Sequence, residues 1–237
     1  EHEDDHEARA ELVIHEIFGS DPLSERVLPA LRHARSKLFA KGAKLVPSQF
    51  TLLCALCHGS MVSNMFNPPS SICGVKGVGE VFRDLSPIVE CLHVPAALSP
   101  LASSDSAELM WLTPPGVVAN FNLEALLDTV PIEHLVELHG PGLPSLEHPG
   151  GHREVCVAYW FRLEGAPSLE TVTGCTEARP WAPCFQALRG CSSSDFASPF
   201  VANIAVRLQD DRIRCKLSRV VLADAEESAD LVGLFET

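Results

Sequence analysis

The sequence lacks a long hydrophobic run, a cleavable leader and any excess of basic residues. No apolar stretch in the 237 residues approaches the length of a membrane-spanning helix, and nothing at the start is typical of a signal peptide. With 18 Lys and Arg against 31 Asp and Glu, the composition does not indicate a nucleic-acid partner. We therefore expect a soluble protein that needs neither a membrane nor a nucleic acid.

Basic residues are also missing from both ends of the chain. Residues 1–7 and residues 224–237 carry five acids each and no Lys or Arg. Without these ten acids the net charge of −13 falls to −3, so the body of the protein is only weakly acidic. The acidic ends can attract basic protein tails, but frayed and solvated termini explain the pattern more simply.

The nine cysteines lack the spacing of a disulfide framework. We expect reduced thiols and a cytoplasmic or nuclear protein. Cys54-Ala55-Leu56-Cys57-His58 has the pattern of covalent haem attachment and of half a zinc site. The sequence contains no second paired-cysteine motif, and the pattern ends an apolar strand-like run, so we expect neither haem nor metal.

Two carboxylates, Glu16 and Glu25, bracket a short stretch that follows an apolar run at residues 12–14. Nine positions along a helix or a strand point the two side chains apart, so only a loop can bring them together. Gly19 and Pro22 are typical of such a loop. The pattern predicts a buried strand ending near Glu16, a tight reversal, and a helix beginning around Ser24.

Carboxylates that share a pocket match the planar fork of a guanidinium through paired hydrogen bonds. The simpler interpretation is a surface loop with two solvated acids.

We expect the helix that follows this loop to reach about Phe39, with Arg32, Arg35 and Lys37 on a solvated face. Gly42 is then read as a helix stop. Residues 43–57 are then expected to form one long strand.

The order and residues of this segment resemble a known enzyme family. Glu16, Glu25, the run Val27-Leu28-Pro29-Ala30-Leu31-Arg32-His33-Ala34-Arg35 and the strand Lys44–Leu53 are similar to the double-E loop, helix and strand of the protein arginine methyltransferases. Leu28-Pro29 and His33-Ala34 resemble most the branch with the monomethylating, type III enzymes. The resemblance implies that Glu16 and Glu25 clamp a substrate arginine beside the methyl group of S-adenosylmethionine.

The resemblance also implies a fold class, which is an α/β remnant of a Rossmann-like methyltransferase domain followed by a mostly antiparallel β-barrel. Residues 1–58 would form the end of the cofactor-binding domain. Residues 59–237 would form the barrel, with a dimerisation arm inserted around residues 83–115. No glycine-rich turn precedes Glu16, so we expect the cofactor-binding half to be missing and residues that bind the cofactor stay unassigned.

Short β-like segments recur through the second part of the chain, as expected for a barrel or a sandwich. The clearest is a hairpin in which residues 200–208 and 212–222 alternate apolar and polar side chains around a Gln209-Asp210-Asp211 turn. The other segments are residues 117–127, 133–138, 154–163 and 182–188. Gly74–Gly79 contains three glycines without dinucleotide-binding spacing, and we read it as a turn.

Two further residues lie near the expected chemistry. Trp181 falls where the family carries a Thr-His-Trp loop that walls the arginine pocket, but Arg179 and Pro180 replace the threonine and histidine. A core tryptophan is an equal alternative. His15 lies beside Glu16, where a core or supporting role is expected.

These features favour a protein arginine methyltransferase-like chain, with an arginine-containing protein substrate and a homodimer as expected partners. The alternative is a truncated or degenerate relative that serves as an interaction or dimerisation module. The missing cofactor half and the altered tryptophan loop favour the module for this chain alone, whereas the pair of glutamates favours an enzyme.

Overall fold

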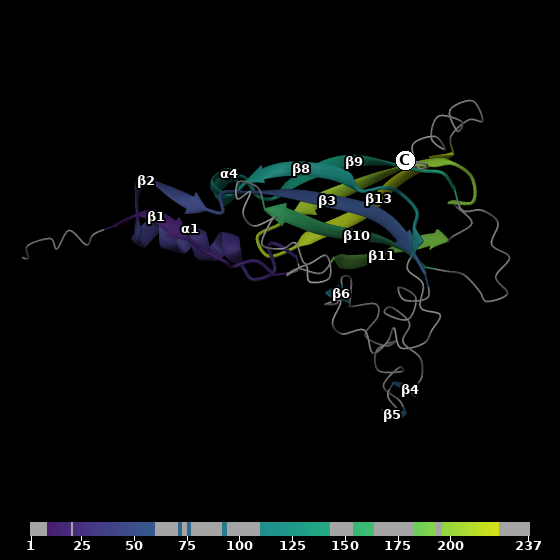
Figure 1. Cartoon of the computed structure of the whole chain (residues 1–237), viewed down its shortest axis with the longest axis horizontal. Coiled ribbons are helices and arrows are strands. Elements are labelled where there is room, and N and C mark those ends of the chain that lie inside the picture. Colours follow the sequence, from purple (N-terminus) through teal and green to yellow (C-terminus); the bar gives the residue numbers. More distant parts are fainter. Residues whose placement is uncertain are drawn as a thin grey trace, which may run out of the picture.

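The computed structural model describes residues 9–19, 21–59, 71–72, 75–76, 92–93, 110–142, 154–163, 183–192 and 196–222. Within these residues the protein is mostly β, with two helices. Figure 1 shows the first strands and helix at one end of the molecule, beside a stack of long strands. No helix among the described residues is long and apolar enough to cross a membrane.

The end shown at the left of Figure 1 consists of a parallel strand pair and a helix. Strand β1 (Ala10–Ile14) leads through a loop into helix α1 (Val27–Lys37), and strand β2 (Phe39–Val46) follows directly. Apolar residues at helical spacing, Val27, Leu28 and Leu31, are buried on one face of α1. This unit carries both glutamates of the expected site.

Strand β3 (Gln49–His58) is the centre of a six-stranded sheet. It pairs antiparallel with β10 (Glu154–Leu163), which pairs with β11 (Cys184–Ser192), and β11 pairs with the two-residue β6 (Leu92–His93). On its other side β3 pairs with β7 (Met110–Trp111) and β8 (Gly116–Asn122). The two-residue strands β4 (Ser71–Ile72) and β5 (Val75–Lys76) pair antiparallel, and the other residues of the expected glycine-rich turn lie outside the described residues.

A second sheet has the order β13-β12-β9. It contains β9 (Ile132–Gly140), β12 (Phe200–Leu208) and β13 (Ile213–Leu222), all antiparallel. Alternate residues of β12 are buried, and β13 returns beside it, so the expected hairpin is confirmed. The inner faces of the two sheets form the core with Leu52, Cys54, Leu56, Val136, Leu138, Val155, Val157, Tyr159, Phe200, Ala202, Ile204, Val206, Leu208, Ile213 and Cys215.

The two large sheets are not joined by strand pairing into a closed ring among the described residues. β11 and β13 lie next to each other, and a side chain of β11 forms hydrogen bonds with the β13 backbone where a paired strand would otherwise do so. The Gln186 amide nitrogen donates to the Cys215 carbonyl at 2.6 Å, and the Gln186 amide oxygen accepts from the Cys215 N–H at 2.8 Å. One residue therefore satisfies both backbone groups of Cys215 across the seam.

The expected strand over residues 117–127 is wrong in its second half. Strand β8 ends at Asn122, and residues Leu123–Thr129 form helix α4. The Asn122 side chain accepts from the Ala125 N–H at 3.0 Å and caps the helix. Leu123, Leu126 and Leu127 are buried at helical spacing, a signal present in the sequence but read as part of a β run.

The first unit also differs from expectation. Helix α1 begins at Val27 and not at Ser24, because residues 22–25 form a turn. Gly42 is not a helix stop but lies inside β2 with a φ of 80°. The single strand expected over residues 43–57 is two strands, β2 and β3, separated at Pro47 and Ser48.

Strand β1 was expected to be buried, but four of its five residues are exposed. Leu12 is 54% and Ile14 is 75% exposed, because among the described residues β1 pairs only with β2. Parallel sheets are usually covered on both faces, whereas this strand pair keeps one face exposed among the described residues.

We predict that Gln186→Leu lowers the free energy of unfolding by about 2 kcal/mol, because it leaves the N–H and C=O of Cys215 without partners in a partly buried seam. Urea denaturation followed by circular dichroism measures the change. Gln49→Leu, at an exposed position on β3, serves as the control and should change stability little. Equal effects of the two substitutions would contradict the proposed role of Gln186.

Candidate functional site

The two glutamates stand at opposite ends of the loop between β1 and α1. Glu16 lies two residues after β1, and Glu25 lies two residues before α1. Both side chains are exposed. The position of Glu16 beyond the carboxyl end of a parallel strand is the position at which α/β sheets usually bind their ligands.

The loop reverses at Gly19, and this brings the chain near Glu25 back against its beginning. A Cβ atom added to Gly19 would lie 2.2 Å from Ser24 Oγ and 3.3 Å from Glu25 Cγ. A larger residue at position 19 therefore collides with the returning chain, and glycine permits the reversal that the sequence predicts.

The middle of the loop is buried, unlike its two acidic ends. Phe18, Pro22 and Leu23 are all buried. The Phe18 ring lies 5.4 Å from the Phe161 ring and 6.2 Å from the Phe50 ring, so it extends an aromatic cluster between β3 and β10. The centre of this segment is therefore part of the core, whereas both acids are exposed, as the simpler interpretation of a surface loop with two solvated acids also expects.

Asp21 fixes the loop to both sheets. Its carboxylate is 1% exposed, and Oδ1 accepts from the Leu23 N–H at 2.8 Å. Oδ2 accepts from the Tyr159 hydroxyl of β10 at 3.1 Å and from the Ile213 N–H of β13 at 2.8 Å. A buried carboxylate is tolerated only with such partners, so Asp21 holds the loop in one place.

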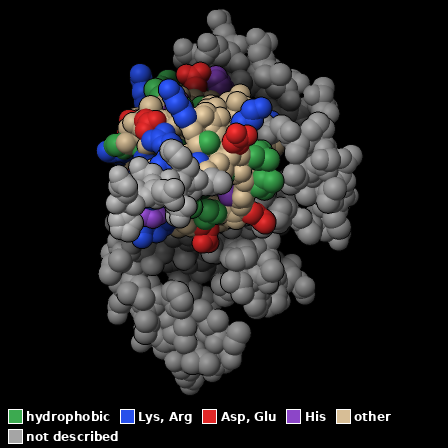
Figure 2. Space-filling model, turned by 90° about the vertical axis from the view of Figure 1, so that its left-hand side faces the viewer, with side chains coloured by type: hydrophobic (Ala, Val, Ile, Leu, Met, Phe, Trp, Pro, Cys, Tyr) green, Lys and Arg blue, Asp and Glu red, His purple; other side chains and the backbone are tan. Residues whose placement is uncertain are grey.

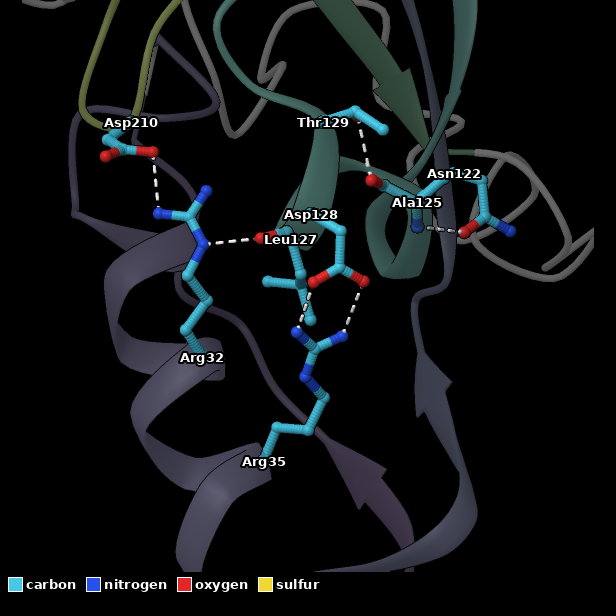
Figure 3. A network of polar contacts seen from close by, with 8 residues as sticks. All are labelled: Arg32, Arg35, Asn122, Ala125, Leu127, Asp128, Thr129 and Asp210. Atoms are coloured by element: carbon cyan, nitrogen blue, oxygen red, sulfur yellow. Dashed lines mark hydrogen bonds and ion pairs between the residues drawn. The ribbon is translucent and has the colours of Figure 1, made fainter.

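Two arginines connect α1 to the rest of the protein (Figure 3). Arg32 donates from Nε to the Leu127 carbonyl at 2.6 Å and from Nη1 to Asp210 in the β12–β13 turn at 2.7 Å. Arg35 binds Asp128 through two hydrogen bonds of 3.0 and 2.5 Å. Arg35 and Lys37 are exposed, as expected for a solvated basic face. Arg32 is half-buried, so that expectation holds only in part for Arg32. The acceptors for both arginines come from α4 and the hairpin turn.

The Arg35 guanidinium holds the pKa of the Asp128 carboxyl below its usual value, mainly through their hydrogen bonds. Both side chains are exposed, so this pair contributes little to stability by itself. Its effect is to orient α1 against α4. Neither pair has a signal in the sequence, because Arg35 and Asp128 are 93 positions apart and Arg32 and Asp210 are 178 positions apart.

His15 lies between the strand and the glutamate loop. Its ring centroid is 5.4 Å from that of Phe18, so the imidazole packs against the aromatic cluster. Burial lowers the pKa of His15, and neither ring nitrogen has a hydrogen-bond partner among the described residues. This environment agrees with the expected core or supporting role.

The third expected site residue, Trp181, lies with its neighbours outside the described residues, and the structure places the two cysteines of the C-x-x-C-H pattern on one strand. Cys54 and Cys57 are three positions apart on β3, so their side chains face opposite sides of the strand. Burial raises the pKa of each thiol to about 12, which leaves both protonated near neutral pH.

Sequence reasoning missed Asp21, Tyr159 and Gln186 as residues that position the site. Asp21 stands directly before Pro22 in a turn, where Asp commonly accepts from the N–H two residues later. That local bond to Leu23 is present. The long-range bonds from Tyr159 and Ile213 have no counterpart in the sequence pattern.

The comparisons with known proteins do not show a family for this chain. No family model and no curated protein matches it. Among solved structures, the chain is similar to the Trypanosoma brucei PRMT1 enzyme–prozyme heterotetrameric complex with AdoHcy, with a TM-score of 0.49 and 12% sequence identity. The match covers 88% of this chain and 65% of that chain, and it says nothing about activity.

We predict that Asp21→Asn lowers the free energy of unfolding by about 2–4 kcal/mol, since an amide places a donor against one of the donors that the carboxylate now accepts. Tyr159→Phe removes one hydrogen bond and leaves the carboxylate two partners, so its effect should be smaller. Urea denaturation of both variants measures the order. An Asp21→Asn protein as stable as the wild type would contradict the anchoring role.

We predict that His15 makes the protein less stable in mild acid. Its unfolded pKa is near 6.5 and its folded pKa is lower, so the unfolded chain binds the proton first as pH falls below about 6.5. The loss levels off below the folded pKa. In His15→Gln the fall in Tm between about pH 7 and about pH 5 should be smaller than in the wild type.

The control for this experiment is His33→Gln, on the exposed part of α1. It should leave the pH dependence of Tm unchanged. If His15→Gln and the wild type lose the same Tm on acidification, burial of the His15 ring does not couple its protonation to folding.

Proposed function

We propose that this chain is the substrate-side part of a protein arginine N-methyltransferase, in which Glu16 and Glu25 bind the guanidinium group of an arginine in a protein substrate. In this proposal residues 1–58 end a Rossmann-like, S-adenosylmethionine-binding domain, and residues 59–237 form a barrel with an arm around residues 83–115. The branch with monomethylating enzymes, a homodimer, and a location in cytoplasm or nucleus belong to the same proposal.

The observation that carries the proposal is the contrast between the loop and its ends. The loop is anchored in the core by Phe18 and Asp21, while Glu16 and Glu25 stay exposed and carry no ion pair among the described residues. Ordinary surface acids on a solvated loop do not need a buried scaffold between them. Two acids held on a fixed turn are suited to a cationic ligand.

The chemistry of such a pair follows from the guanidinium itself. Arginine stays protonated near neutral pH, so its nitrogens are poor nucleophiles. Two carboxylates that accept hydrogen bonds from two of the nitrogens draw positive charge towards them and orient the third. The contribution of Glu16 and Glu25 is therefore positioning and electrostatic stabilisation fixed before the substrate arrives.

The described residues do not form a cradle for S-adenosylmethionine. Gly19 is the glycine that follows β1, but the returning chain at Ser24 and Glu25 fills the space where its side chain would be. Gly19 thus serves the reversal and leaves no room for a cofactor. The cofactor would supply the methyl group from a site outside these residues, and β1, exposed and paired only with β2 in the described chain, offers an edge for further strands.

We predict that the chain binds N-acetyl-arginine amide more tightly than N-acetyl-citrulline amide, which has the same shape without the charge. Chemical shifts of the amides of residues 16–25, followed during titration, measure the affinities. Glu16→Gln and Glu25→Gln should each weaken arginine binding by about ten- to a hundredfold, because each removes a charged acceptor. Glu11→Gln, at an exposed position on β1, is the matched control and should change nothing.

Equal binding of arginine and citrulline, or equal losses in the Glu11 and Glu25 variants, would contradict the proposal. Calorimetry with S-adenosylmethionine should show no binding to the present chain. In a form of the protein that includes a cofactor-binding half, Glu16→Gln and Glu25→Gln should abolish transfer of methyl groups to arginine peptides while the thermal unfolding stays unchanged. Unaltered turnover in both variants would remove the assignment of the glutamates.

A second candidate function is a non-catalytic interaction module. The observation in its favour is the group of exposed apolar side chains on β1, β2 and the end of α1, which are Leu12, Ile14, Leu38 and Val46. An exposed apolar strand pair is typical of a surface that another polypeptide covers. Arginine binding that depends on Glu16 and Glu25 would favour the enzyme, and its absence together with self-association would favour the module.

A further inference from the structure

Positive charge is concentrated at the α1–β2 end of an otherwise acidic protein. Residues 26–58 contain six Lys or Arg and no Asp or Glu, although the net charge of the chain is −13. Figure 2, which faces this end of the molecule, shows Lys and Arg side chains gathered among the described residues. A basic surface on an acidic protein attracts anions locally.

A hollow of about 380 Å³ lies in this basic region, between α1, β2 and α4. An irregularity of β2 forms one wall. Ala10 pairs with Phe39 and Leu12 pairs with Lys44, so Ala40, Lys41, Gly42 and Ala43 stand opposite Glu11 alone. This excursion of the chain turns at Gly42, whose φ is 80°, and places Lys41 at the hollow.

The cations at the hollow differ in how they are paired. Arg35 is bound by the two oxygens of Asp128, which neutralises it. Arg9, before β1, and Lys41, on β2, form no ion pair among the described residues. Glu124 is the only acid in the lining. Two cations from different elements therefore converge on one space with a single acid beside them.

The rest of the lining is apolar. Phe39, Leu45 and Leu127 are nearly buried and form the floor, with Ala40 and Ala43 beside them. Such a combination of apolar walls and a few polar groups is typical of sites for small molecules. Free phosphate would contact the cations but would make no contact with the apolar floor of the hollow.

We propose that this hollow is a binding site for a small organic phosphate, whose dianionic group is bound by Arg9 and Lys41 and whose apolar part contacts Phe39, Leu45 and Leu127. A phosphate monoester carries close to two negative charges near neutral pH, which matches two cations that have no carboxylate partner among the described residues. Arg9 also donates from Nη1 to the Phe39 carbonyl at 3.5 Å, which holds its guanidinium at the hollow. The planar guanidinium of Arg9 can donate to two phosphate oxygens at once, and the Lys41 ammonium attracts the phosphate as a point charge. Neither Glu16 nor Glu25 lines this hollow, so the phosphate proposal does not depend on the proposed function.

Titration of the chain with phenyl phosphate, followed by the backbone amide shifts of Gly42, Ala43 and Leu45, tests the proposal. We expect saturable shifts with a Kd of about 1 mM or lower, and at least fivefold weaker binding of inorganic phosphate and of benzoate. The first comparison lacks the apolar part, and the second lacks one negative charge. Higher salt should weaken all three.

Variants separate a built site from general attraction to a basic surface. Lys41→Ala and Arg9→Ala should each weaken phenyl phosphate binding at least fivefold. Lys44→Ala removes the same charge from the same strand, at an exposed position that does not line the hollow, and should weaken it less than twofold. Equal losses for Lys41→Ala and Lys44→Ala, equal affinity for phenyl phosphate and inorganic phosphate, or shifts that do not saturate would each overturn the proposal.

Discussion

A single buried carboxylate holds the three parts of this protein together. Asp21 belongs to the loop between β1 and α1, yet its oxygens accept from Tyr159 of one sheet and Ile213 of the other. A charge in the core is stable only where donors replace water, so the position of the loop is bound to the relative position of the two sheets. The aromatic packing of Phe18 acts in the same place, and together they leave the loop little freedom. The positions of the exposed glutamates at either end of the loop are therefore fixed by buried residues that do not themselves contact a ligand.

The sequence was informative where structure depends on neighbours along the chain. The loop with its reversal at Gly19, helix α1 and the β12–β13 hairpin follow from glycine, proline and apolar spacing, and the structure contains them. It failed at residues 123–127, whose leucines have helical spacing after the Asn122 cap but were interpreted as the end of a strand. It had no means of finding the bonds from Asp21 to Tyr159 or from Arg32 to Asp210, because these join residues more than a hundred positions apart. Of the candidate site, the position of the two glutamates could be predicted, whereas the residues that fix them in place could not.

The two ends of the first unit show opposite relations to their surroundings. Helix α1 is fixed to the rest of the protein by Arg32 and Arg35, which bind a backbone carbonyl and two carboxylates (Figure 3). Strand β1, by contrast, keeps Leu12 and Ile14 exposed. The α1 side of the unit thus contacts the rest of the protein, whereas the β1 side is exposed. This asymmetry agrees both with an enzyme whose remaining sheet strands attach at β1 and with a module that recruits another polypeptide there.

The Gln186 bridge at the β11–β13 seam has a consequence for association. Ile213 and Cys215, alternate residues of β13, have their N–H groups already occupied by Asp21 and Gln186, so this margin of the hairpin presents no free donors there for an intruding strand. Unprotected sheet margins are templates for fibrillar stacking and for exchange of segments between copies. The seam therefore resists such stacking, because side chains from distant parts of the chain occupy its donors. This protection does not require a continuous ladder of backbone hydrogen bonds, with its rigidity, between β11 and β13.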